Sequence, residues 1–70
     1  MTQKIEIFLN GEKKIIPTNW AIGDLIDHLG LERRQVAIEL NREIVKRKRW
    51  SEKQFGVGDQ VEIVHFVGGG

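Results

Sequence analysis

Hydrophobic and polar residues alternate along several stretches of the chain, which is the pattern of strands that bury one face. The first stretch covers residues 4–9 and runs into Asn10-Gly11. Because both of these residues accept a positive φ, the pair is a strong hairpin signal, and residues 12–16 are predicted to form the return strand. Pro17 has no N–H to donate to a ladder, so the return strand is expected to end there.

The hydrophobic pattern changes its period after residue 20. Ile22, Leu25, Ile26 and Leu29 stand at positions i, i+3, i+4 and i+7, which places them in one stripe of an α-helix. Gly30 suits the left-handed residue that stops a helix. Since a helix this short is unstable alone, it is predicted to be held by packing against the sheet.

Alternation returns in the second half of the chain. A strand is predicted at residues 35–40, followed by a turn and a short strand candidate at 43–46. Residues 47–55 are expected to be irregular or to form a single helical turn. The last strand, residues 60–67, carries apolar residues on both faces, so it is predicted either to be central in the sheet or to contain a bulge.

The predicted order is therefore two strands, a helix and two or three further strands. One helix laid across one face of a mixed sheet buries both apolar faces in a single core layer. This is the α+β arrangement called the β-grasp or ubiquitin-like fold, here with four to five strands and one main helix. No repeat or boundary divides the sequence, so residues 1–70 are expected to form a single domain, with residues 67–70 as a flexible tail.

Charge and composition narrow the function classes. Lys and Arg number 11 and Asp and Glu number 10, and the resulting net charge of +1 disfavours general nucleic-acid or membrane binding. The absence of cysteine excludes a disulfide framework, a thiolate metal site and a cysteine nucleophile. No segment suits a signal peptide or a membrane span, so a cytoplasmic protein, monomeric when alone, is expected. A core this small disfavours an enzyme with catalytic residues of its own.

Positive charge is concentrated in the middle of the chain, where Lys46 to Arg49 form an unbroken basic run. We interpret this run as a solvated loop that steers the chain toward an acidic partner, in preference to a nucleic-acid site. The two histidines, His28 and His65, stand on separate predicted elements without a third ligand. No metal site is therefore predicted.

Three apolar side chains are candidates for a partner-binding surface. Ile44 and Phe66 would resemble the apolar contact patch of ubiquitin-like proteins if they lie on an exposed sheet face. Trp50 is a candidate anchor for a partner, and the alternative is that it packs at the edge of the thin core. The sequence does not decide which face of the sheet is exposed.

Glycines follow the last predicted strand directly, in the ending Val67-Gly68-Gly69-Gly70. Such an ending can be an idle frayed tail. A tip without Cβ atoms can also thread a narrow channel and present the Gly70 carboxylate to the active site of another protein. A carboxylate resists nucleophiles until it is activated, and adenylation by ATP supplies the leaving group.

Several stretches together carry a resemblance to one family along essentially the whole chain. They are Asn10-Gly11, Ile22 to Leu29, Val36 to Asn41 with Ile44-Val45, Arg49-Trp50, Gly58 to Val64, and the ending Ile63 to Gly70. The chain resembles the ThiS family, the sulfur carrier proteins of thiamine biosynthesis. The segment 41–50 favours this family over its relatives, although the basic run replaces a segment in which a proline often follows the two apolar residues.

The resemblance implies a chemistry for the glycine tail. An E1-like adenylating enzyme of the ThiF type would use ATP and Mg²⁺ to convert the Gly70 carboxylate to an acyl-adenylate, and the chain itself would bind no cofactor. A sulfur donor protein would then yield a thiocarboxylate, which delivers sulfur to a thiazole synthase of the ThiG type. In this interpretation Gly70 is the modified residue, Gly69 its essential neighbour and Gly68 an extension of the tip.

Other functions stay open on the sequence. A MoaD-like small subunit of molybdopterin synthase would use the same thiocarboxylate tail. A ubiquitin-like modifier would join its tail to a lysine through an isopeptide bond. A plain interaction domain would need no tail chemistry at all.

Overall fold

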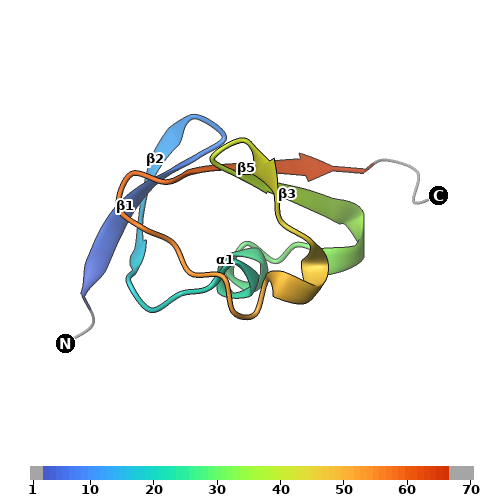
Figure 1. Cartoon of the computed structure of the whole chain (residues 1–70), viewed down its shortest axis with the longest axis horizontal. Coiled ribbons are helices and arrows are strands. Elements are labelled where there is room, and N and C mark those ends of the chain that lie inside the picture. The colour runs from blue at the N-terminus through green and yellow to red at the C-terminus, as the bar shows by residue number, and fades with distance from the viewer. Residues whose placement is uncertain (1–2, 67–70) are drawn as a thin grey trace.

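A computed structural model describes residues 3–66 as a five-stranded mixed sheet with one α-helix against one face (Figure 1). The strand order across the sheet is β2-β1-β5-β3-β4, which confirms the predicted mixed sheet with a single main helix. The expected tail, residues 67–70, lies outside the described residues. The elements in chain order are β1 (Lys4–Leu9), β2 (Glu12–Pro17), α1 (Ile22–His28), η1 (Arg33–Gln35), β3 (Val36–Leu40), β4 (Glu43–Ile44), η2 (Arg47–Arg49) and β5 (Gln60–His65).

The first two strands form the predicted hairpin. Asn10 and Gly11 have φ values of 49° and 84°, as a tight turn between twisted antiparallel strands requires. β2 includes Pro17, one residue more than predicted, because the N–H of Thr18 still donates to the carbonyl of Gln3 at 2.9 Å. The nitrogen of Pro17 points to the free edge of the sheet, where no donor is needed.

Helix α1 ends at His28, one residue earlier than predicted. Leu29 is its C-cap, and Gly30 follows with φ +70°, so the predicted stop at Gly30 is confirmed. At the other end, the Asp24 carboxylate accepts a hydrogen bond from the N–H of Ala21 at 2.8 Å, which satisfies one donor of the first turn.

One apolar core lies between α1 and the sheet. Fully burying one aliphatic side chain of this size contributes roughly 1.5–3 kcal/mol, so the seven-residue helix is held by tertiary packing. Strands β1, β2, β3 and β5 supply the sheet side of this core. Its buried members are Ile7, Leu9, Ile16, Ile22, Leu25, Ile26, Val36, Ile38, Leu40, Trp50, Phe55 and Val61.

Strand β5 occupies the centre of the sheet. Of the two predicted alternatives, a central strand or a bulged strand, the first is therefore confirmed. It runs parallel to β1 at Leu9↔Val61 and antiparallel to β3 from Val36↔His65 onward. Its second apolar face is exposed, since Val64 retains 49% of its accessible surface. The described strand ends at His65, and the predicted continuation to residue 67 reaches beyond the described residues.

The segment after β3 departs from an extended path sooner than predicted. β4 comprises only two residues, and the N–H of Val45 adds one further bond to the carbonyl of Ile38 at 3.0 Å. The chain then forms η2, the single helical turn that the sequence allowed. No helix among residues 3–66 is both long and apolar enough to cross a membrane.

Candidate partner-binding face and tail stem

The face of the sheet opposite α1 carries an exposed apolar patch. Ile44 lies on β4 and is 76% exposed, and Phe66, directly after β5, is 52% exposed. The register Ala37↔Val64 places Val64 on this face, and Ile44 lies on it through the pair Glu39↔Ile44. We call Ile44, Val64 and Phe66 the apolar face.

The apolar face is a candidate docking surface, because three exposed apolar side chains share one face of the sheet. The structure shows that the face carrying Ile44 and Phe66, which the sequence left undecided, is exposed, and it adds Val64 to that face. Alternation along β5 was the signal for Val64, but alternation alone does not separate a buried second face from an exposed one.

Trp50 is not available to a partner, and the prediction that it anchors one is wrong. Its side chain is 2% exposed and belongs to the hydrophobic core. The indole Nε1–H donates to the carbonyl of Val45 at 2.8 Å, so the polar end of the ring is also satisfied inside the domain. The side chain closes the core beneath η2, which is why the short 47–50 segment can leave the sheet without opening a cavity.

Strand β5 is the stem that leads to the glycine tail. The N–H of Ile63 donates to the side-chain oxygen of Asn10 at 2.8 Å. The N–H of Phe66 donates to the carbonyl of Gln35 at 2.7 Å, which extends the pairing with β3 past the end of the strand. The backbone is therefore fixed on the β3 side up to Phe66, the last described residue. Gly68, Gly69 and Gly70 themselves lie outside the described residues.

The turn before β5 is organised by a second asparagine. Asn41, with φ 52°, accepts a hydrogen bond from the N–H of Gln60 at 2.9 Å and donates to the Asp59 carboxylate at 3.1 Å. The same carboxylate accepts from the N–H of Gly56 at 2.7 Å. Together with Asn10, Asn41 positions the stem, and neither asparagine was singled out as such from the sequence.

The histidines do not come together. His28 packs against Trp20 with ring centroids 5.0 Å apart, whereas His65 lies on β5. Among residues 3–66, no three His, Cys, Asp or Glu side chains are grouped so as to hold a metal ion. The described part of the chain thus offers an exposed apolar face and a hydrogen-bonded stem that ends at Phe66.

The family pattern named ThiS matches residues 2–70. The chain belongs to the ThiS family. A sulfur carrier protein ThiS from Bacillus subtilis is 45% identical over 49 residues, which cover 70% of this chain and 74% of that protein. The crystal structure of the thiamine biosynthesis protein ThiS from Geobacter metallireducens superposes with a TM-score of 0.80 at 26% identity, covering 94% of this chain and 100% of that one. The ThiS neighbour confirms the β-grasp fold.

Two longer relatives contain a ThiS-like stretch. Thiazole synthases from Paramagnetospirillum magneticum and Magnetococcus marinus are each 35% identical to this chain over 66 residues. The match covers 94% of this chain and 20% of each thiazole synthase, so the chain spans about a fifth of their length. In those two proteins, a region similar to this ThiS-family domain is part of the same polypeptide that is named thiazole synthase.

Proposed function

We propose that this chain is a sulfur carrier of thiamine biosynthesis and acts as a co-substrate of partner enzymes. The observation that carries the proposal is the ThiS-family match over residues 2–70, supported by the 45% identity to a ThiS sulfur carrier. The geometry agrees with it, because the backbone is held by hydrogen bonds up to Phe66, two positions before the first glycine of the ending, and β5 carries part of the exposed apolar face.

In the proposed reaction, an E1-like enzyme of the ThiF type binds ATP and Mg²⁺ and the Gly70 carboxylate attacks the α-phosphorus. Pyrophosphate leaves and an acyl-adenylate forms. Sulfide delivered by a donor then attacks the acyl carbon, the bond to AMP breaks and a proton is lost, which gives a C-terminal thiocarboxylate. Activation is needed because a carboxylate is a poor electrophile, and glycine suits the tip because no Cβ obstructs its approach.

The proposed acceptor is a thiazole synthase of the ThiG type. Two thiazole synthases contain a region, about a fifth of their length, that is similar to this chain. This similarity supports the proposal, because covalent linkage is one way to keep a carrier close to the enzyme that it serves. In this proposal the apolar face docks on the partner, while the tail reaches into its active site. Gly69 and Gly68 provide the narrow part of that tail.

An intact mass spectrum tests the proposal. The chain is incubated with a ThiF-type enzyme, ATP, Mg²⁺ and sulfide, and a mass gain that matches one oxygen replaced by one sulfur is expected. The matched control lacks Gly70 and should show no gain. No gain in the full chain, with an enzyme shown to be active on another carrier, would refute the proposal. A covalent ladder on lysines of other proteins would instead indicate a modifier.

A further inference from the structure

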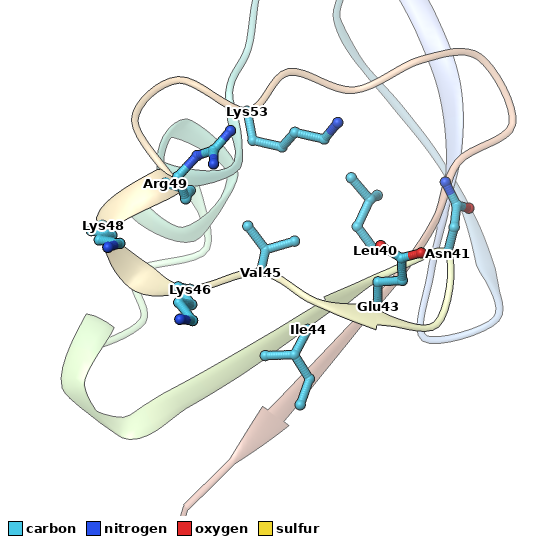
Figure 2. A pocket seen from close by; sticks show the side chains of 9 residues that line it. All are labelled: Leu40, Asn41, Glu43, Ile44, Val45, Lys46, Lys48, Arg49 and Lys53. Atoms are coloured by element: carbon cyan, nitrogen blue, oxygen red, sulfur yellow. The ribbon is translucent and has the colours of Figure 1, made fainter.

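An open hollow follows the edge strand β4 on the side away from the apolar face. It has a volume of about 600 Å³, and its lining combines the four cationic side chains Lys46, Lys48, Arg49 and Lys53 with the aliphatic side chains of Leu40 and Val45 (Figure 2). Val45 and Leu40 point into it, whereas Ile44 points to the other side of the strand. We call it the basic hollow; its lining residues are Leu40, Asn41, Glu43, Ile44, Val45, Lys46, Lys48, Arg49 and Lys53.

The cations of the basic hollow are available to a ligand. Lys46, Lys48 and Lys53 are exposed, and within residues 3–66 none of them forms an ion pair. Arg49 pairs with Glu52 at 2.6 Å, but both side chains are about 60% exposed, so water and salt weaken this pair and an incoming carboxylate can compete for it. Glu43 is the single acidic residue in the lining.

The wall of the hollow is held in place by the helix. The first N–H groups of α1 bind carbonyls of the segment after η2, with Ile22 to Lys53 and Gly23 to Trp50 both at 2.9 Å. On the core side of the hollow, the indole N–H of the buried Trp50 donates a hydrogen bond to the carbonyl of Val45. The backbone that carries Arg49 and Lys53 is therefore fixed, and only the ends of the cationic side chains need to be ordered by a ligand. This lowers the entropic cost of binding.

The chemistry of the lining favours a protein segment over a nucleic acid. Leu40 and Val45 form an aliphatic floor, and no aromatic ring lines the hollow for base stacking. The net charge of the chain is only +1, which gives little of the long-range attraction that a phosphate backbone requires. Carboxylates placed around one aliphatic side chain match both the rim and the floor.

We propose that the basic hollow binds an acidic segment of the adenylating enzyme, one with carboxylates on both sides of an aliphatic residue. This inference rests on the proposed function, because it assigns the partner through the enzyme that acts on the tail. A carrier must meet and leave that enzyme in every cycle, and complementary charge accelerates the encounter without requiring tight binding. Ile44, the last residue of β4, points toward the apolar face, and Val45, directly after it, points toward the hollow, so one partner bound along this edge contacts both surfaces.

A peptide titration tests the chemistry of the hollow independently of the tail. Backbone amide spectra of the ¹⁵N-labelled full chain are recorded with the peptide acetyl-Asp-Glu-Leu-Glu-Asp-amide and with its uncharged counterpart acetyl-Asn-Gln-Leu-Gln-Asn-amide. The acidic peptide should shift the amides of Val45, Lys46, Lys48, Arg49 and Lys53, and high salt should abolish the shifts. Equal shifts with the uncharged peptide, or shifts confined to other residues, would overturn the proposal. Stronger shifts of the same amides with oligouridine would assign the hollow to nucleic acid instead.

A charge-reversal pair tests the assignment to the adenylating enzyme. Lys46→Glu with Lys53→Glu should raise the KM for the carrier in adenylation by roughly tenfold, as expected when electrostatic steering is lost, while kcat is unchanged. Lys4→Glu with Lys14→Glu makes the same charge change at the β1–β2 side of the sheet and should leave KM unchanged. Equal KM values for both pairs would overturn the proposal while leaving the sulfur-carrier function intact. Failure of the unmodified chain to be adenylated would refute the sulfur-carrier function. The peptide titration would still show whether the basic hollow binds an acidic segment.

Discussion

The side-chain oxygen of Asn10 accepts a hydrogen bond from the backbone N–H of Ile63 at 2.8 Å, although the two residues are 53 positions apart in the chain. β1 ends at Leu9, so the hairpin turns away before its backbone reaches this level of β5. The N–H of Asn10 also donates to the carbonyl of Val61 at 2.8 Å. One turn residue thus continues the parallel ladder with its side chain, where the strand itself has stopped.

Asn10→Gly should therefore loosen the stem. Glycine keeps the positive φ of the turn, so the change removes the side-chain bond with little backbone strain. We expect the free energy of unfolding to fall by about 1 kcal/mol, the usual net contribution of one hydrogen bond, and the amide of Ile63 to exchange faster. Urea unfolding and hydrogen exchange measure the two effects. Asn10→Asp retains an acceptor and should exchange at Ile63 like the unmodified chain; equal exchange in Asn10→Gly would contradict the role of this bond.

The variant Trp50→Phe tests whether the Trp50 side chain acts in the core or in contact with a partner. The change leaves the carbonyl of Val45 without its indole donor and creates a small cavity, so we expect a loss of about 1–3 kcal/mol in the free energy of unfolding. Denaturant unfolding followed by circular dichroism measures this loss. At a temperature where the variant is folded, the KM for adenylation should change by less than about twofold, because Ile22 and Gly23 still bond to the backbone carbonyls of Lys53 and Trp50 and hold the wall of the basic hollow. A KM raised tenfold in a variant of unchanged stability would contradict a purely structural role for the Trp50 side chain.

Ile44→Asp should affect docking and spare the fold. Ile44 is 76% exposed, so the free energy of unfolding should change by less than about 0.5 kcal/mol. A charge placed in an apolar contact should reduce kcat/KM for adenylation by roughly tenfold, equivalent to about 1.4 kcal/mol. Val57→Asp is the matched control, because Val57 is an equally exposed apolar residue, 77%, in the turn before β5. Similar losses of activity in both variants would argue against a localised docking face.

Asp59→Ala should destabilise the turn that starts β5. The carboxylate accepts from the N–H of Gly56 and from the side chain of Asn41, and both bonds are lost in the variant. We expect a loss of about 1–2 kcal/mol, because each exposed bond contributes modestly. Asp59→Asn keeps one acceptor oxygen and should lose less. Thermal unfolding ranks the variants, and an order in which Asp59→Asn is the less stable would contradict this account.

Local signals in the sequence predicted most of the elements. Asn10-Gly11 located the hairpin and Gly30 the end of the helix, because both depend on backbone conformations that few residue types accept. The lengths of β2, β4 and α1 differed from prediction by one or two residues. These ends depend on neighbours in space. Pro17 stays in its strand because the N–H of Thr18 bonds to the carbonyl of Gln3. Just after β4, the carbonyl of Val45 accepts a hydrogen bond from the indole of Trp50.

The candidate site was only partly predictable. Ile44 and Phe66 were candidates only if their face of the sheet was exposed, and the structure shows that it is, whereas of the two alternatives for Trp50 the core role is the one observed. A tryptophan beside a basic run has the same sequence pattern in either role, and the difference comes from whether the chain folds back over the ring. The basic hollow depends in the same way on how η2 and the 50–53 segment return to α1, which no local pattern records.

The position of β5 also determines when the sheet can form during synthesis of the chain. β5 lies between β1 and β3, yet it is the last described strand to leave the ribosome. A nascent chain that has reached Gly58 holds the β1–β2 hairpin and the β3–β4 pair with no strand to join them. Because joining them closes a long loop, the sheet is expected to form late and in one step. Chains that end before β5 therefore lack Val64 and Phe66, and the complete apolar face exists only in a domain whose stem is already in place.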